Sequence, residues 1–355
     1  MTRLIWGNVE INKLRQIVLG ILFSFYVGLA QAKPEGVSVE SATWRFEFDN
    51  DVFFGKDNKI SSGWSLQRHS AVVESWDALG GIGRWGAVFP TLAKEGLVYR
   101  SGIAVGQVIQ TPDDLSRSDL IEDDVPYAGV LALHASWYAF SDEEFRGFNI
   151  VVGVVGPLSL AEQTQKTIHK WIDGIEPKGW DNQLSTEPVI NCTYMRKKKI
   201  WRMGNPAGIS FDAAINGDVG LGNLFTHAGV SLEMRLGRNM EGGFMSVPNP
   251  VGLDMYYMAS LKPAYPEKAS FYASLVLRGN VIVHTIFSDG NTFRDSHSVD
   301  KEPLVGQVIG GLHYERKRWG IHFNGLISAD TVDTKKTFAA EGRECLGTIV
   351  VEWRF

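Results

Sequence analysis

The stretch Ala42-Thr-Trp-Arg-Phe-Glu-Phe-Asp49 alternates strictly between apolar and polar side chains. Successive side chains of an extended strand point to opposite faces, so Trp44, Phe46 and Phe48 share one face and the charged residues share the other. The same alternation recurs along the chain, in an even set of twelve segments that ends on an aromatic residue. The segments are residues 42–49, 64–69, 98–110, 126–139, 146–156, 188–197, 207–217, 226–236, 269–286, 304–316, 319–329 and 345–355.

This alternation fits either a soluble β-sandwich or a transmembrane barrel. Most of the segments approach the roughly 9–11 residues that a tilted strand needs to cross a membrane. Their apolar faces are rich in Trp, Tyr and Phe, which form the interface girdles of such barrels. Barrel closure is also the only way in which strands satisfy every backbone group in lipid. We therefore predict an all-β fold, a transmembrane antiparallel β-barrel of about twelve strands.

The composition of the 355 residues excludes several other classes. A mean hydropathy of −0.07 excludes a bundle of apolar transmembrane helices. The 44% hydrophobic content excludes intrinsic disorder, and a net charge of −5 argues against a nucleic-acid partner. The two cysteines, Cys192 and Cys345, are too few for a disulfide scaffold or a thiolate zinc site. We expect them to pack as small apolar residues, with a bridge between them left open.

Residues 1–32 have the pattern of a secretory signal peptide. Three basic side chains precede a short apolar run at residues 17–30, and Ala30-Gln31-Ala32 matches the cleavage pattern. A membrane anchor is the alternative, but the run is short for a span. Removal of residues 1–32 takes away three basic residues and one acidic residue, so the predicted barrel domain, residues 33–355, carries −5 − 2 = −7.

The lengths of the connections predict the topology, because such barrels have short periplasmic turns and longer outer loops. We expect short turns at residues 141–144, 196–199 and 316–318, and outer loops at residues 51–61, 111–125, 157–187, 287–303 and 330–344. Residues 71–97 make an unusually long periplasmic link, and residues 237–268 are rich in Gly, Pro and Met without a clear strand. For both we expect periplasmic packing or extra irregular structure and nothing more specific.

The third outer loop holds the strongest candidate for chemistry. Ser159 with Glu162 three residues later forms a capping-box pattern, and Gly174 is a suitable stop, so a short helix of about four turns is expected. Gln165 and His169 then lie one turn apart on the same face of the helix. A histidine beside an amide donor can serve as general base and oxyanion stabiliser, although a surface histidine without function is the alternative.

The first outer loop begins with Asp49-Asn50-Asp51 and ends with Lys59-Ile-Ser-Ser-Gly63. Its carboxylate, amide, hydroxyl and backbone oxygens could hold a hard cation such as calcium. An Asx-rich turn without a metal is the alternative. The first and third outer loops emerge at the same rim, so the curvature of the barrel can bring their side chains together.

These loops resemble the lipid A 3′-O-deacylase family of Gram-negative outer membranes. The likeness rests on Phe48-Asp-Asn-Asp51, on Asp124-Val-Pro-Tyr-Ala-Gly129, and on Gly156-Pro…Gln165…His169 continuing to Gly179-Trp-Asp-Asn-Gln-Leu184 and Glu187-Pro188. It spans roughly residues 42–195. The family often has an arginine in the second motif, where this chain has Val125.

The resemblance implies a calcium-dependent ester hydrolase at the outer-leaflet rim, which removes a 3′-linked acyl or acyloxyacyl chain from lipid A. In that family His169 corresponds to the general base and Gln165 to the residue that supports the oxyanion or positions water. Asn50 and Asp51 correspond to the residues that shape the metal site, together with the hydroxyl of Ser61.

The resemblance also implies an acidic residue after the histidine. Ile175 stands at the expected spacing, so we choose the neighbouring Glu176. Lys166 and Lys170 flank the helix and could meet the phosphates of an anionic glycolipid.

The expected partners are lipopolysaccharide and outer-membrane lipid, and the oligomeric state is left open. Two alternatives remain: a barrel of the phospholipase type that cleaves glycerophospholipid, and a non-catalytic pore or binding barrel.

Overall fold

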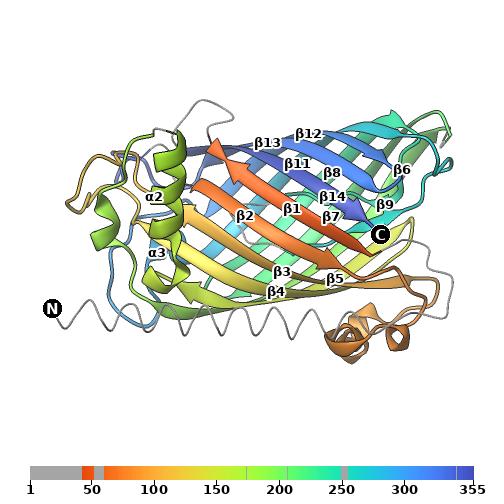
Figure 1. Cartoon of the computed structure of the whole chain (residues 1–355), viewed down its shortest axis with the longest axis horizontal. Coiled ribbons are helices and arrows are strands. Elements are labelled where there is room, and N and C mark those ends of the chain that lie inside the picture. The colour runs from red at the N-terminus through yellow and green to blue at the C-terminus, as the bar shows by residue number, and fades with distance from the viewer. Residues whose placement is uncertain (1–41, 52–59, 173, 206, 249–254, 341) are drawn as a thin grey trace.

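The computed structural model describes residues 42–51, 60–172, 174–205, 207–248, 255–340 and 342–355. Within them, twelve long strands form a closed antiparallel barrel (Figure 1). The strands are β1 (Thr43–Asn50), β2 (Ile60–His69), β3 (Val98–Gln110), β4 (Ala128–Phe140), β5 (Glu144–Val155), β6 (Glu187–Gly204), β7 (Ile209–Gly222), β8 (Phe225–Arg238), β11 (Ser270–Thr285), β12 (Leu304–Arg316), β13 (Trp319–Asp330) and β14 (Arg343–Arg354). This confirms the predicted fold and all twelve predicted strands. The predicted signal peptide, residues 1–32, lies outside the described residues.

The strands follow the order of the chain around the barrel, except that β8 pairs directly with β11. β14 closes the barrel against β1, with Thr43 opposite Arg354 and Asn50 opposite Gly347. The intervening strands β9 (Gly242–Phe244) and β10 (Ala259–Leu261) form a small separate sheet. None of the helices in the described residues is long and apolar enough to cross a membrane.

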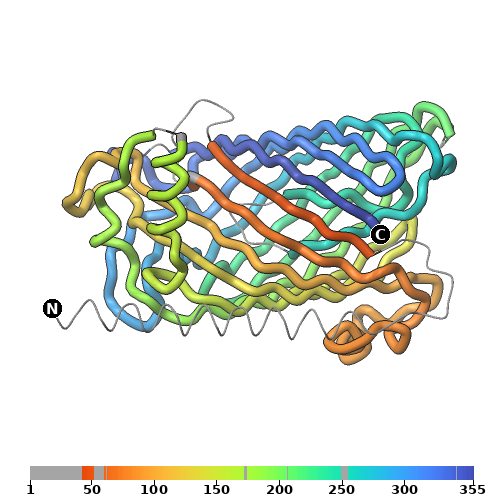
Figure 2. Tube along the Cα trace, viewed as in Figure 1, coloured from red at the N-terminus to blue at the C-terminus, as the bar shows by residue number. Residues whose placement is uncertain are grey.

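The two ends of the barrel differ in their connections. At one end, here called the turn end, lie the start of β1, the end of β14 and the short turns at 141–143, 205–208 and 317–318. The opposite end, the loop end, holds the helices α2 (Ala161–Ile172) and α3 (Ile286–Asp289), which Figure 2 shows at the far end from the C-terminus. The predicted alternation of short turns and long loops is therefore largely confirmed.

One predicted turn is wrong. Residues 196–199 lie inside β6, and the chain turns only at 205–208. The basic run resembles a solvated turn, but every second side chain points into the lumen. There Lys197 Nζ lies 2.6 Å from Glu233 Oε1, and Lys199 Nζ lies 2.7 Å from Asp212 Oδ2.

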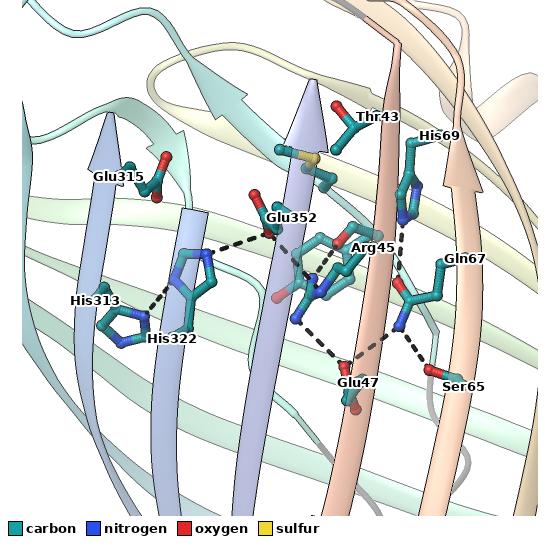
Figure 3. Close-up of polar contacts among 12 residues, drawn as sticks. Thr43, Arg45, Glu47, Ser65, Gln67, His69, His313, Glu315, His322 and Glu352 are labelled. Atoms are coloured by element: carbon teal, nitrogen blue, oxygen red, sulfur yellow. Dashed lines mark hydrogen bonds and ion pairs between the residues drawn. The ribbon is translucent and has the colours of Figure 1, made fainter. Parts of the chain in front are cut away.

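The wall of the barrel has a polar inner face and an apolar outer face. Figure 3 shows the inner face, where Glu47 Oε2 lies 3.4 Å from Arg45 Nη2 and accepts a hydrogen bond from Gln67 Nε2. His322 Nε2 lies 3.4 Å from Glu352 Oε1 in the same network. Outward positions carry exposed apolar side chains, among them Leu221, Val230 and Leu312. The two faces average to the near-zero hydropathy of the chain.

The described parts of the connection between β8 and β11, residues 239–248 and 255–269, fold into the lumen from the turn end, which was not predicted. Arg45 Nη1 donates to the carbonyl of Tyr257 (3.4 Å), and Arg100 Nη1 donates to the carbonyl of Met258 (3.2 Å). The hydroxyl of Tyr257 donates to the carbonyl of Met245 (2.7 Å) and is itself buried. This packing fills the lumen near the turn end and argues against an open pore.

The connection between β2 and β3 forms three short 3-10 helices, η2 (Trp76–Ala78), η3 (Gly81–Val88) and η4 (Pro90–Leu92), which were also not predicted. Cys192 lies in β6 and Cys345 in β14, and no disulfide joins them, so the alternative of a bridge between them is wrong.

Candidate active site on the outer wall

Helix α2 lies against the outward face of the barrel wall. In β3 the even-numbered residue Arg100 contacts the connection that fills the lumen, so the odd-numbered Gln107 and Ile109 point outward. By the same alternation Gly129 of β4, which pairs with Ile109, points outward. A Cβ on Gly129 would lie 2.1 Å from the Cβ of Ala161, so only glycine lets the helix approach this closely. Figure 1 shows α2 at the loop end.

The start of α2 is fixed by contacts to the wall. Gln107 Nε2 donates to the carbonyl of Ser159 (2.7 Å), and the amide of Ala161 donates to Ser159 Oγ (3.3 Å). The predicted helix is confirmed, but its predicted capping box differs in detail. Glu162 does not reach back to the helix start; its Oε1 accepts a hydrogen bond from Lys166 Nζ (2.8 Å).

Gln165 lies on the buried side of α2, with only 2% of its surface exposed. Its Oε1 accepts a hydrogen bond from Trp180 Nε1 at 2.8 Å. An indole N–H can only donate, so the oxygen of the amide must face Trp180 and the Nε2 donor must face away. Within the described part of the chain, that Nε2 is buried and has no partner. The Nε2 group of Gln165 can therefore donate a hydrogen bond to an acceptor on a bound ligand.

Two of the quoted motifs meet around this amide. The rings of Tyr127 and Trp180 pack with their centroids 5.0 Å apart. Gly179 leaves room for Tyr127, because a Cβ there would lie 2.4 Å from the tyrosine ring. Burial raises the pKa of Tyr127 to about 12, so the phenol stays protonated. The sequence motifs included Trp180 and Tyr127 but gave them no role. In the structure Trp180 holds the amide of Gln165 by a hydrogen bond, and Tyr127 packs against Trp180.

His169 is partly buried one turn after Gln165. Its Nδ1 lies 2.5 Å from the carbonyl oxygen of Ile175. A carbonyl can only accept, so Nδ1 is the donor in this contact, and in the neutral ring Nε2 is then the nitrogen with the lone pair that a general base uses. Glu176, the predicted acidic partner, is exposed, and the orienting group against His169 is a backbone carbonyl instead.

The pairing of β1 and β2 brings the backbone positions of the predicted metal ligands near one another. Asn50 pairs with Ser62, and Ser61 lies at a β-bulge one residue nearer the loop end. Asp51 directly follows β1 and is 2% exposed. Asn50 is on the outward face of β1, the same face of the wall as Gln107. The Ser61 side chain and residues 52–59 lie outside the described part.

Asn50 and Asp51 offer the oxygen donors that calcium prefers. Among the described residues, no group of three or more His, Cys, Asp or Glu side chains could hold a metal ion. A calcium ion beside Asp51 would therefore take most of its ligands from amide, hydroxyl, backbone and water oxygens. These donor types fit calcium and are a poor match for a softer metal.

Two other acidic residues of the motifs, Asp124 and Glu187, hold the loops in place. Asp124 accepts hydrogen bonds from the amides of Val125 (2.7 Å) and Asp113 (2.9 Å). Glu187 accepts from the amides of Thr292 (2.8 Å) and Phe293 (3.2 Å), which ties two outer loops together.

Val125 is buried against Val332 and Ala340 of the last outer loop. An apolar side chain therefore suits this position. The two flanking lysines differ: Lys166 is paired with Glu162, whereas Lys170 is exposed.

A closed antiparallel barrel with an apolar outward face and a polar site under a loop helix defines the class: an outer-membrane β-barrel protein with a candidate site on its outer wall. A family model described as outer membrane protein LpxR matches residues 17–355, and the chain belongs to this family.

The structure is similar to LpxR from Salmonella typhimurium, at a TM-score of 0.69 and 12% identity, over 88% of this chain and 100% of that chain. The beta domain of the Bordetella autotransporter BrkA has a TM-score of 0.43 and 10% identity, over 89% of this chain and 100% of that chain. No curated protein sequence matches significantly.

Proposed function

We propose that this outer-membrane protein is an esterase that removes the 3′-linked acyl or acyloxyacyl chain of lipid A. The observation that carries the proposal is the buried, unpartnered Nε2 donor of Gln165, one helical turn from the free Nε2 of His169. Both side chains belong to α2, which lies on the outward side of the wall, where membrane lipid meets the barrel. The family membership and the resemblance of the loops support lipid A as the substrate.

In the proposed reaction, His169 Nε2 takes a proton from water as the water oxygen attacks the ester carbonyl. Negative charge develops on the carbonyl oxygen, which accepts a hydrogen bond from Gln165 Nε2. Collapse of this intermediate breaks the ester bond. As this bond breaks, the imidazolium of His169 gives the proton to the leaving oxygen of the sugar, so the products are a fatty acid and an alcohol.

Asn50, Asp51 and Ser61 would hold a calcium ion, which when bound would supply positive charge near the developing oxyanion. Lys166 and Lys170 would meet the phosphates of lipid A from the solvent side of α2. The site would face the outer leaflet, because long loops of such barrels lie outside the cell.

The test is mass spectrometry of lipid A from a Gram-negative host that lacks such an activity and produces either this chain or one of two variants. The wild-type chain should lower the mass of lipid A by one acyl or acyloxyacyl group. His169→Ala should leave the mass at the level of an empty vector, and Gln163→Ala, an exposed position on the same helix, should retain activity. A chelator should abolish the activity of the purified wild type, and calcium should restore it.

Other outcomes would select the alternatives. Unchanged lipid A with loss of glycerophospholipid would favour the phospholipase type. Unchanged lipids with conductance in planar bilayers would favour a pore, and unchanged lipids without conductance a binding barrel.

A further inference from the structure

The connection between β2 and β3, residues 71–97, packs on the outside of the barrel at the turn end. In β4 the side chain of Tyr138 points into the lumen, where its hydroxyl accepts a hydrogen bond from the amide of Met258. Its neighbours Trp137 and Ala139 therefore point outward. Both are nevertheless buried, because η2, η3 and η4 cover them. Figure 1 shows this coil below the wall, beside the turn end of the barrel.

The contact between this segment and the wall is specific. Phe89 stacks on Phe148 of β5 with ring centroids 4.3 Å apart, and Trp137 Nε1 donates to the carbonyl of Ile82 (2.8 Å). Inside the segment, a Cβ on Gly86 would lie 2.3 Å from the ring of Trp76, so the coil is closely packed on itself. The segment is therefore a built part of the wall.

On its opposite side the segment exposes two apolar side chains, beside the exposed Arg84, whose Nε donates to the carbonyl of Leu79 (2.9 Å). Trp85 is 59% exposed and Val88 is 73% exposed on the same short helix, η3. Charged contacts lie at the end of the segment, where Lys94 pairs with Glu144 and Arg146 Nη1 donates to the carbonyl of Thr91 (2.9 Å). An apolar face with polar groups at its edge is typical of an element that lies in a membrane interface.

Three exposed tryptophans of the wall also lie near the turn end of the barrel, on β6, β13 and β14. Trp201, Trp319 and Trp353 are exposed on the outer face of the wall, each a few residues from the turn end. On β4 a tryptophan, Trp137, also points outward three residues before the strand ends, but it is buried under the segment. Trp85 stacks over it, with the ring planes 19° apart, and so stands on its outer side.

We propose that residues 71–97 form an interfacial anchor, which places Trp85 and Val88 at the boundary between headgroups and acyl chains in the periplasmic leaflet. The occupant of this surface is phospholipid, because the segment continues the lipid-facing wall on which it packs. Tryptophan favours this level of a bilayer. The anchor sets the depth of the barrel on the side of β3–β5, which is also the side that carries α2 at the opposite rim.

Fluorescence quenching in vesicles tests the proposal. The purified full chain is folded into phosphatidylcholine vesicles with or without bromine on the acyl chains, and the contribution of one tryptophan is the difference between wild type and its phenylalanine variant. Trp85→Phe is compared with Trp353→Phe, an exposed girdle position, and Trp180→Phe, a buried one. The contribution of Trp85 should be quenched by brominated lipid as strongly as that of Trp353, and should resist iodide in the water.

Two results would overturn the proposal. Quenching by iodide and not by brominated lipid would place Trp85 in water, and protection from both would mean that protein, such as a second copy of the chain, covers it. If Trp85→Phe does not fold, a spin label on Val88→Cys replaces it, in a background with Cys192→Ala and Cys345→Ala. Collisions with oxygen should then exceed those with a water-soluble nickel chelate, and the reverse order would refute the anchor.

Discussion

The hydrogen bond from Trp180 to Gln165 permits a quantitative test of the proposed site. Gln165→Met removes the Nε2 donor and keeps a side chain of similar length. Loss of one oxyanion donor costs about 10²–10³-fold in kcat, so this variant should lose activity to that extent. Trp180→Phe keeps an aromatic ring against Tyr127 but removes the N–H that holds the amide in one orientation.

The effect of Trp180→Phe should be smaller. A hydrogen bond of this kind contributes about 0.5–1.5 kcal/mol net, and each 1.36 kcal/mol corresponds to a tenfold change in rate, so kcat should fall about 2- to 12-fold. The change should appear in kcat and leave KM nearly constant, since the amide acts on the developing charge rather than on the bound ester. Stability should also fall, because Oε1 of Gln165 is left buried without a donor.

The double variant decides whether Trp180 acts through Gln165. In the Gln165→Met background, Trp180→Phe should cost nothing further in kcat. The assay is release of fatty acid from lipid A in mixed micelles, with folding checked by the shift of the barrel band on unheated gels. If Trp180→Phe lowers kcat by the same factor in both backgrounds, the positioning argument is refuted. If Gln165→Met keeps the wild-type rate, Gln165 is not the oxyanion donor.

Three further changes test other parts of the structure. Glu176→Gln should leave kcat within about twofold of wild type, because the carbonyl of Ile175 orients the histidine; a loss comparable to that of a missing base, about 10²–10⁴-fold, would restore the carboxylate to that role. Gly129→Val should detach α2 from the wall, so that activity is lost and protease cleaves the helix while the barrel still resists it. The pKa of Asp289 lies at about 2: burial raises it, but hydrogen bonds, among them one from Lys301, lower it further. Its stabilising effect should therefore be complete above its unfolded pKa of about 3.9 and disappear as the pH falls through about 2, so Asp289→Asn should destabilise the outer loops against protease at neutral pH and have little effect near pH 2.

The strands were predictable because alternation is a local property of the sequence. The stretch at residues 42–49 shows its two faces without reference to any other part of the chain. The basic run at residues 196–199 was misjudged for the opposite reason. Lysines normally stay in water, and only the neighbouring strands supply Glu233 and Asp212, the carboxylates that allow Lys197 and Lys199 to face the lumen.

The candidate site was predictable in its residues but not in its arrangement. Gln165 and His169 share a helix face at any location of that helix, so their pairing follows from spacing alone. The side of the wall on which α2 lies depends on Gly129 meeting Ala161, a contact between distant segments. The same holds for Trp180, whose contact with Gln165 requires the loop to fold back over the helix. Residues 71–97 have neither alternation nor a helical period, because their apolar side chains follow the shape of the wall.

The outward face near the loop end explains why a helix must lie there. Asn50, Ser62 and Gln107 are polar side chains at outward positions of three adjacent strands, where lipid-facing strands carry apolar residues. Left in contact with acyl chains, such groups would lose their hydrogen bonds to water without replacement. The segment that leads into α2 covers part of this surface and supplies an acceptor to Gln107. The same helix carries the buried Gln165, so one helix both shields a polar patch from lipid and holds the proposed oxyanion donor beside the membrane.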